Sequence, residues 1–131
     1  MRIFQKMEGD VNCVVWDASL VLAKYLETMC QTKPEFLSGL RVLELGSGLG
    51  VVGLTAATLG AQVTLTDLPE ALPLLRLNLS ENKSKIASMG GYAIAESLVW
   101  GIATSNRNPA VFKSHTETEA HNIFNTRTKR F

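Results

Sequence analysis

The chain has 131 residues, of which 46% are hydrophobic and 19% charged, a length and composition typical of one globular domain of modest size. This composition excludes a collagen-like chain and a wholly disordered one. The formal net charge of +1 gives no global electrostatic reason to expect nucleic acid or an anionic membrane as a partner.

The charges are divided unevenly along the chain. Residues 1–101 carry 8 Lys and Arg against 10 Asp and Glu, whereas residues 102–131 carry 5 against 2. We expect an N-terminal segment over residues 1–12, a folded part over residues 13–101 and a polar tail over residues 102–131. The apolar residues of the tail follow neither a strand nor a helix period, so we expect the tail to be disordered.

Sequence features that would indicate a metal, a disulfide framework or a membrane are weak. Cys13 and Cys30 are too few for a disulfide framework, and His115 and His121 lack metal-ligand spacing, so we expect free thiols and no metal. The N-terminus has no signal-peptide pattern, and the most apolar stretch, residues 51–63, is shorter than the roughly 20 residues of a spanning helix. We therefore expect a cytoplasmic location, with the nucleus as a second one.

The first half of the chain predicts an extended segment over residues 13–16 and then a helix, which starts at Ala18 and is capped by Asp17. Residues 40–45 are rich in Leu and Val, which is typical of a buried parallel strand. Residues 50–59 are small and apolar and predict a helix, which Gly60 closes.

The pattern then repeats. A second strand is predicted over residues 62–66, and a helix from Pro69 to about Asn78, which Pro73 is expected to distort. A polar loop over residues 80–91 and a third strand over residues 92–100 complete the series. This βαβαβ order predicts an α/β fold, namely one half of a doubly wound, Rossmann-like parallel sheet.

A glycine-rich turn, residues 44–50, joins the first strand to the following helix. Its glycines let the backbone turn sharply and approach a ligand closely, and the helix then presents its N-terminus to that ligand. Such a turn alone is weak evidence for a ligand, since tight strand–helix turns need glycine for steric reasons. Here Asp67 ends the next strand, where a carboxylate can accept both hydroxyls of a ribose. The alternative role of Asp67 is to cap the helix that starts at Pro69.

The pattern also discriminates between nucleoside cofactors. The dinucleotide fingerprint requires a third glycine where this chain has Val51. Glu44 instead lies two residues before Gly46, and a buried carboxylate there would repel a pyrophosphate and suit a cationic ligand. This favours S-adenosylmethionine, which carries an ammonium and a sulfonium group, over NAD.

Four ordered motifs resemble the family-16 seven-β-strand protein-lysine methyltransferases: Cys13–Ala18, Leu43–Gly48, Val63–Leu68 and Leu98–Gly101. The resemblance runs from about Gly9 to Gly101. It implies a class I methyltransferase fold, of which this chain would hold the N-terminal half with about three strands. The Trp-Asp-Ala segment and Lys24–Glu27 are most similar to the branch that methylates valosin-containing protein. The branches for Hsp70 chaperones and elongation factor 1A are close competitors.

The resemblance implies roles in binding S-adenosylmethionine for seven residues: Trp16, Glu44, Gly46, Ser47, Gly48, Asp67 and Trp100. In the family, residues matching Trp16 pack beside the methionine end, the glycine loop with the acid behind it lies under the cofactor, and the residue matching Asp67 binds the ribose. Trp100 resembles an aromatic residue near the adenine. Without this context, either tryptophan would more often be a core residue. Leu49 departs from the usual Thr, at a position expected to contribute mainly backbone.

The family's acidic-x-x-Tyr motif, which is tied to its catalytic face, has no counterpart after Gly101. We therefore expect residues 102–131 to be unrelated to the family and the chain to be a C-terminally truncated or alternatively spliced form. No catalytic residue is assigned. The resemblance implies a protein-lysine methyltransferase with a protein substrate and no nucleic acid or membrane partner. The alternative is a catalytically silent form that acts as a binding module or has no function.

Overall fold

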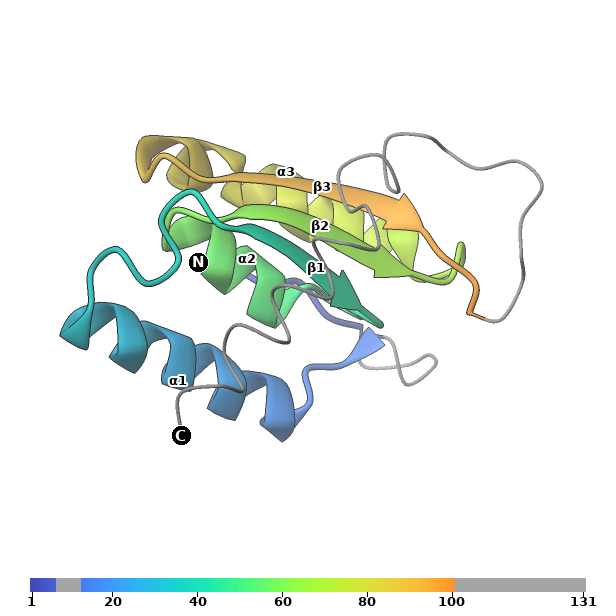
Figure 1. Cartoon of the computed structure of the whole chain (residues 1–131). Coiled ribbons are helices and arrows are strands. Elements are labelled where there is room, and N and C mark those ends of the chain that lie inside the picture. Colours follow the sequence, from blue (N-terminus) through green and yellow to red (C-terminus); the bar gives the residue numbers. More distant parts are fainter. Residues whose placement is uncertain (7–12, 101–131) are drawn as a thin grey trace. The chain divides into compact units, whose positions relative to one another are not determined.

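The computed structural model describes residues 1–6 and 13–100, which form one parallel sheet with its helices (Figure 1). The elements in chain order are α1 (Asp17–Thr32), β1 (Arg41–Leu45), α2 (Val51–Thr58), β2 (Gln62–Asp67), α3 (Leu72–Ser88) and β3 (Tyr92–Ser97). The expected α/β, Rossmann-like class with three parallel strands is confirmed.

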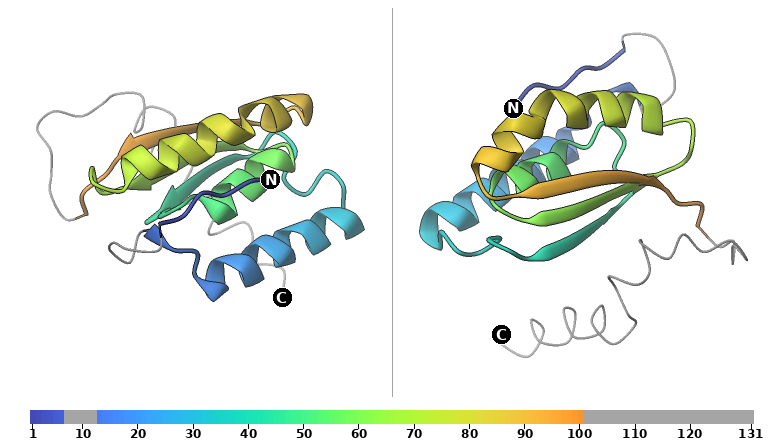
Figure 2. Two further views of the ribbon diagram at one scale, coloured as in Figure 1. Left: turned by 180° about the vertical axis from the view of Figure 1, so that it is seen from behind. Right: turned by 90° about the horizontal axis from the view of Figure 1, so that it is seen from above.

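The strands lie in the order β1-β2-β3, and both neighbouring pairs are parallel. Val63 of β2 lies opposite Val42 of β1 and Ala93 of β3. Helices α2 and α3 lie on one face of the sheet, and α1 packs against α2 on that side (Figure 2). The carboxyl ends of all three strands therefore meet at one edge, where a doubly wound fold binds its ligand.

The core lies between the sheet and these helices. Leu54 of α2, Leu65 of β2 and Leu75 of α3 are fully buried there. Burying three such side chains stabilises the fold by roughly 1.5–3 kcal/mol each. Their packing fixes α2 against the sheet and so fixes the β1–α2 turn that precedes it.

Helix α3 differs from the prediction at both ends. It begins at Leu72 rather than Pro69, so Pro73 lies within the first turn, where a missing N–H costs nothing, and the expected distortion does not occur. It also continues to Ser88, so the loop predicted over residues 80–91 is wrong. The cause is a buried stripe in which Asn78 and Asn82 take positions that the sequence pattern reserves for apolar residues.

The other boundaries differ less. Helix α1 begins at Asp17 itself, with Trp16 at the N-cap, so the predicted cap by Asp17 is wrong. Trp16 is extended, but residues 13–16 add no strand to the sheet. Strand β3 ends at Ser97 rather than residue 100. The expectation for residues 102–131 lies outside the described residues and stays a prediction.

None of the helices in the described part of the chain is long and apolar enough to cross a membrane. Within the same residues, no group of three or more His, Cys, Asp or Glu side chains could hold a metal ion. Of the two cysteines, which are free thiols, Cys30 is buried and Cys13 partly exposed.

Candidate functional site

The β1–α2 turn has a left-handed backbone at each of its three glycines. Gly46, Gly48 and Gly50 have φ angles of 65°, 52° and 82°. A Cβ on Gly48 would meet nothing within 4 Å, so conformation rather than space requires glycine there. The backbone conformation of the turn therefore depends on the glycines of the sequence motif.

Ser47 connects this turn to β2 by hydrogen bonds. Its N–H donates to the Thr66 carbonyl (3.0 Å), and its hydroxyl accepts from the Thr66 N–H (3.0 Å). The Thr66 hydroxyl donates in turn to the Glu44 carbonyl at 2.6 Å. The bonds between Ser47 and Thr66 are buried, since these residues are 8% and 0% exposed, and the bond to Glu44 is partly buried. Ser47 and Thr66 thus connect the turn to β2 by hydrogen bonds within the chain itself.

Asp67 lies at the end of β2 and reaches back to the turn. Its Oδ2 accepts from the Gly48 N–H (2.6 Å), and its Oδ1 accepts from the Leu68 N–H (2.7 Å). The N-cap of α3 is Ala71, and no side chain caps that helix, so Asp67 is not a helix cap. Each carboxylate oxygen can accept a second hydrogen bond, which leaves capacity for ligand hydroxyls.

Glu44 lies behind the turn and faces the first turn of α2. Its Oε2 accepts from the Gly53 N–H at 2.9 Å. Burial raises the pKa of Glu44 to about 7, the nearby Asp67 carboxylate adds to this, and the Gly53 and Ser47 hydrogen bonds oppose it. At neutral pH Glu44 is therefore divided between a neutral and a charged form, and its preference for a cationic ligand is weaker than a fully ionised acid would give.

A cavity of about 320 Å³ opens in front of the turn. One wall comes from the start of α1 and the residues before it, including Val15 and Trp16, and the other from the turn, including Gly46 and Leu49. Predicted residues that line it are Trp16, Glu44, Gly46, Ser47 and Gly48. The Trp16 side chain is 59% exposed at its rim, so Trp16 is not a core residue.

The other two predicted residues lie next to these lining residues. Asp67 is connected to the cavity through its hydrogen bond with Gly48. Trp100 lies against Gly46, since a Cβ on that glycine would be 3.5 Å from the indole ring. Trp100 is 68% exposed, so it too is not a core residue. All seven predicted positions thus lie in or beside one region at the carboxyl ends of β1 and β2.

The sequence did not predict Asn78 of α3, which makes a hydrogen bond to the turn. Its Nδ2 donates to the Leu49 carbonyl at 3.0 Å, and Asn78 is fully buried. Leu49 itself is 3% exposed, so its side chain packs in the core as well as contributing backbone. A signal was available, because Asn78 and Asn82 share the helical spacing of Leu75 and Leu79.

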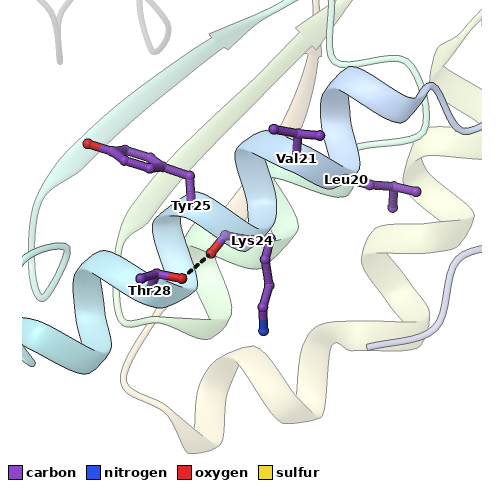
Figure 3. Close-up of a pocket in the computed structure, with 5 residues that line it drawn as sticks. All are labelled: Leu20, Val21, Lys24, Tyr25 and Thr28. Atoms are coloured by element: carbon purple, nitrogen blue, oxygen red, sulfur yellow. Dashed lines mark hydrogen bonds between the residues drawn. The ribbon is translucent and has the colours of Figure 1, made fainter.

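A larger hollow, of about 480 Å³, lies on the outer side of α1 (Figure 3). Its lining residues are Leu20, Val21, Lys24, Tyr25 and Thr28. The Thr28 hydroxyl donates to the carbonyl of Lys24 (3.0 Å), and the Lys24 ammonium pairs with Glu27 (3.1 Å). No predicted site residue lines this hollow, so the smaller cavity at the glycine turn is the candidate site.

Several proteins of similar sequence are named as lysine methyltransferases. Protein N-lysine methyltransferase METTL21A of Mus musculus is 40% identical over 102 residues, which is 78% of this chain and 44% of that protein. Protein-lysine methyltransferase METTL21E of Bos taurus is 41% identical over 99 residues, 75% of this chain and 32% of that protein. EEF1A lysine methyltransferase 3 of Xenopus tropicalis is 49% identical over 86 residues, 64% of this chain and 37% of that protein. The chain thus spans less than half the length of these relatives.

A solved structure described as an RNA methyltransferase of Pyrococcus horikoshii superposes with a TM-score of 0.48 at 22% identity, over 75% of this chain and 46% of that one. The family model for lysine methyltransferases, methyltransferase family 16, matches residues 1–116. This match extends past Gly101, where the sequence motifs end, and the division at residue 102 stays a prediction. The chain belongs to the lysine methyltransferase family.

Proposed function

We propose that this chain binds S-adenosylmethionine in the cavity at the glycine turn and provides the methyl-donor side of a protein-lysine methyltransferase. The observation that carries the proposal is the Asp67 carboxylate, which is fixed at the end of β2 by the Gly48 N–H. A carboxylate held beside a left-handed glycine turn and a helix N-terminus suits a ribose next to the turn.

The residues around the cavity fit this ligand. Asp67 would accept the ribose hydroxyls, Trp16 would pack beside the methionine end, and Trp100 would lie near the adenine. Glu44, in its ionised form, would favour a ligand with positive charge over a pyrophosphate. When bound, the cofactor supplies a methyl group whose C–S bond breaks as a C–N bond forms to a neutral lysine amine. In-line geometry of this kind depends on rigid placement, which the Ser47 and Thr66 bonds provide.

We propose a protein substrate, and valosin-containing protein first among the candidates. The support is the resemblance of Trp16–Ala18 and Lys24–Glu27 to that branch. Hsp70 and elongation factor 1A are the competing substrates, and one of the relatives is named as an EEF1A lysine methyltransferase. Incubation with methyl-labelled cofactor and each purified substrate would identify the acceptor. Cofactor binding without transfer to any of them would favour the binding-module alternative.

Calorimetric titration with S-adenosylmethionine tests the site directly. Asp67→Ala should weaken binding by roughly ten- to a hundredfold, because a hydrogen bond to a charged group contributes about 1.5–3 kcal/mol. Glu70→Ala is the matched control, since Glu70 is an exposed acid three residues further along the chain. Binding that is indifferent to Asp67→Ala, or equally weakened by Glu70→Ala, would overturn the assignment.

A further inference from the structure

The N-terminal segment Arg2–Lys6 is held along α3 by two buried asparagine side chains (Figure 2). Asn78 accepts from the Phe4 N–H (2.7 Å) and donates to the Phe4 carbonyl (3.1 Å). Asn82 does the same for Arg2, at 2.9 and 2.6 Å. Each amide thus pairs with one residue of the segment as a neighbouring strand would, and the two are 0% and 2% exposed.

The same segment contacts the wall of the cavity that the glycine turn forms. The Nδ2 of Asn78 that pairs with Phe4 also donates to the Leu49 carbonyl in the turn, at 3.0 Å. Ile3 packs against the small cluster of Ala23, Leu49 and Val51. A hydrogen-bonded bridge through Asn78 joins the N-terminal segment to Leu49, and an apolar contact joins it to the cluster that contains Leu49.

The segment also holds the opposite wall. The Gln5 side-chain oxygen accepts from the Val15 N–H (3.2 Å), and the Lys6 N–H donates to the Cys13 carbonyl (2.9 Å). Val15 is followed directly by Trp16, and both line the cavity. Between Ile3 and Lys6, therefore, a few consecutive residues contact both walls.

We propose that the segment Arg2–Lys6 sets the spacing of the two cavity walls and thereby the affinity for the methyl donor, with Asn78 as the positioning residue that connects it to the glycine turn. The ligand named here rests on the proposed function. The connection between segment and turn does not, because it follows from the hydrogen bonds of the chain alone. The two can therefore be tested separately.

A pair of proline substitutions isolates the Asn78 connection. Phe4→Pro removes the N–H that Asn78 accepts. Arg2→Pro removes the equivalent N–H from Asn82, which lies one helical turn further along α3 and bonds with Arg2 and the Asn78 carbonyl rather than with the turn. Phe4→Ala, which keeps the N–H, controls for loss of the ring. In hydrogen exchange, Phe4→Pro should raise the rates of the Gly48 and Gly50 amides at least about tenfold, while Arg2→Pro and Phe4→Ala leave them near wild type.

Cofactor titration gives the second measurement. Phe4→Pro should weaken binding of S-adenosylmethionine by about the same factor as it speeds exchange of the turn, while the β2 amides of Val63 and Leu65 stay protected. Equal effects of Phe4→Pro and Arg2→Pro on the turn, or none from either, would overturn the proposal. If wild type itself binds no cofactor, the proposed function fails and the exchange result still decides the coupling.

A milder variant covers the case in which Phe4→Pro unfolds the chain and the β2 amides lose protection. Gln5→Ala removes only an exposed acceptor, and it should speed exchange at Val15 and weaken cofactor binding about threefold with an unchanged melting temperature. Unchanged Val15 exchange in Gln5→Ala would then count against the proposal.

Discussion

Glu44 is an acid that the fold keeps partly neutral, and this makes stability depend on pH. Burial raises its pKa from the ordinary value of 4.5 to about 7. Between these values the folded state binds more protons, so the free energy of unfolding falls as pH rises from about 4.5 to 7. The fall is about 3 kcal/mol at most, since one pKa unit corresponds to about 1.4 kcal/mol.

Glu44→Gln should remove this dependence, because glutamine keeps an acceptor for the Gly53 N–H and never ionises. Urea unfolding at pH 5 and pH 8 measures it. Wild type should lose stability relative to Glu44→Gln between the two values. Parallel pH profiles for the two proteins would show that Glu44 is ionised in the fold throughout.

The affinity for the cofactor should also depend on the ionisation of Glu44, but it should rise with pH whereas the stability falls. A cationic ligand near Glu44 favours the ionised carboxylate, so its binding releases a proton and its affinity rises as pH increases through about 7. We expect the dissociation constant of S-adenosylmethionine to fall between pH 6 and 8 in wild type and to change less in Glu44→Gln. A change of equal size in both proteins would assign the pH dependence to the ligand's own amine.

Individual site residues could be predicted from the sequence where a chemically suitable side chain stands at the position where the fold binds a ligand. Glu44 and Asp67 are acids at or near the ends of two neighbouring strands, and Gly46 begins the turn after β1, so together they indicated a ligand site. Asn78 was missed although its helical spacing with Leu75 places it on the buried face of α3, because an asparagine within a polar stretch resembles a surface residue. Its function depends on a partner 74 residues away, Phe4, which no local pattern reveals.

At the scale of elements, helix α2 can pack closely against the sheet because residue 53 is a glycine, although the helix itself does not require glycine there. A Cβ on Gly53 would collide with Glu44 Oε2 of β1 and with Leu65 Cδ2 of β2. Gly→Ala within an exposed helix normally stabilises by up to about 1 kcal/mol. Here overpacking should prevail and destabilise by about 1–3 kcal/mol.

Urea midpoints for Gly53→Ala measure this balance. Ser84→Ala is the control, because Ser84 is exposed in α3 and its substitution reports helix propensity alone. We expect Gly53→Ala to be less stable than wild type and Ser84→Ala to be equal or slightly more stable. A stabilised Gly53→Ala would mean that α2 can shift away from the sheet.

Apolar runs in the sequence predicted an element well where that element is buried on both sides. Strand β2 is buried on both sides, and its Val, Leu and Thr residues identified it to within one residue. The second half of α3 was missed because it is amphipathic with asparagines on its buried face, so its polar composition resembled a loop. Tertiary hydrogen bonds to the N-terminal segment stabilise that half, and helix propensity does not report them.

At the scale of the whole molecule, the sheet has an apolar face that no described helix covers. The side chains of β1 alternate, so Glu44 faces α2 while Leu43 and Leu45 point away from the helices and are 38% and 54% exposed. Within the described residues, β1 also pairs on one side only. Open strand edges and exposed apolar surface both promote association between copies.

We therefore predict that the 131-residue polypeptide self-associates through the helix-free face of its sheet. Leu45→Glu should raise the monomer fraction in sedimentation velocity at increasing concentration, because a charge on this face costs free energy when copies pack together. Val21→Glu is the matched control, since Val21 is 70% exposed on the outer side of α1. An equal effect of Val21→Glu would move the association surface to α1. A wild type that stays monomeric at all concentrations would contradict the prediction.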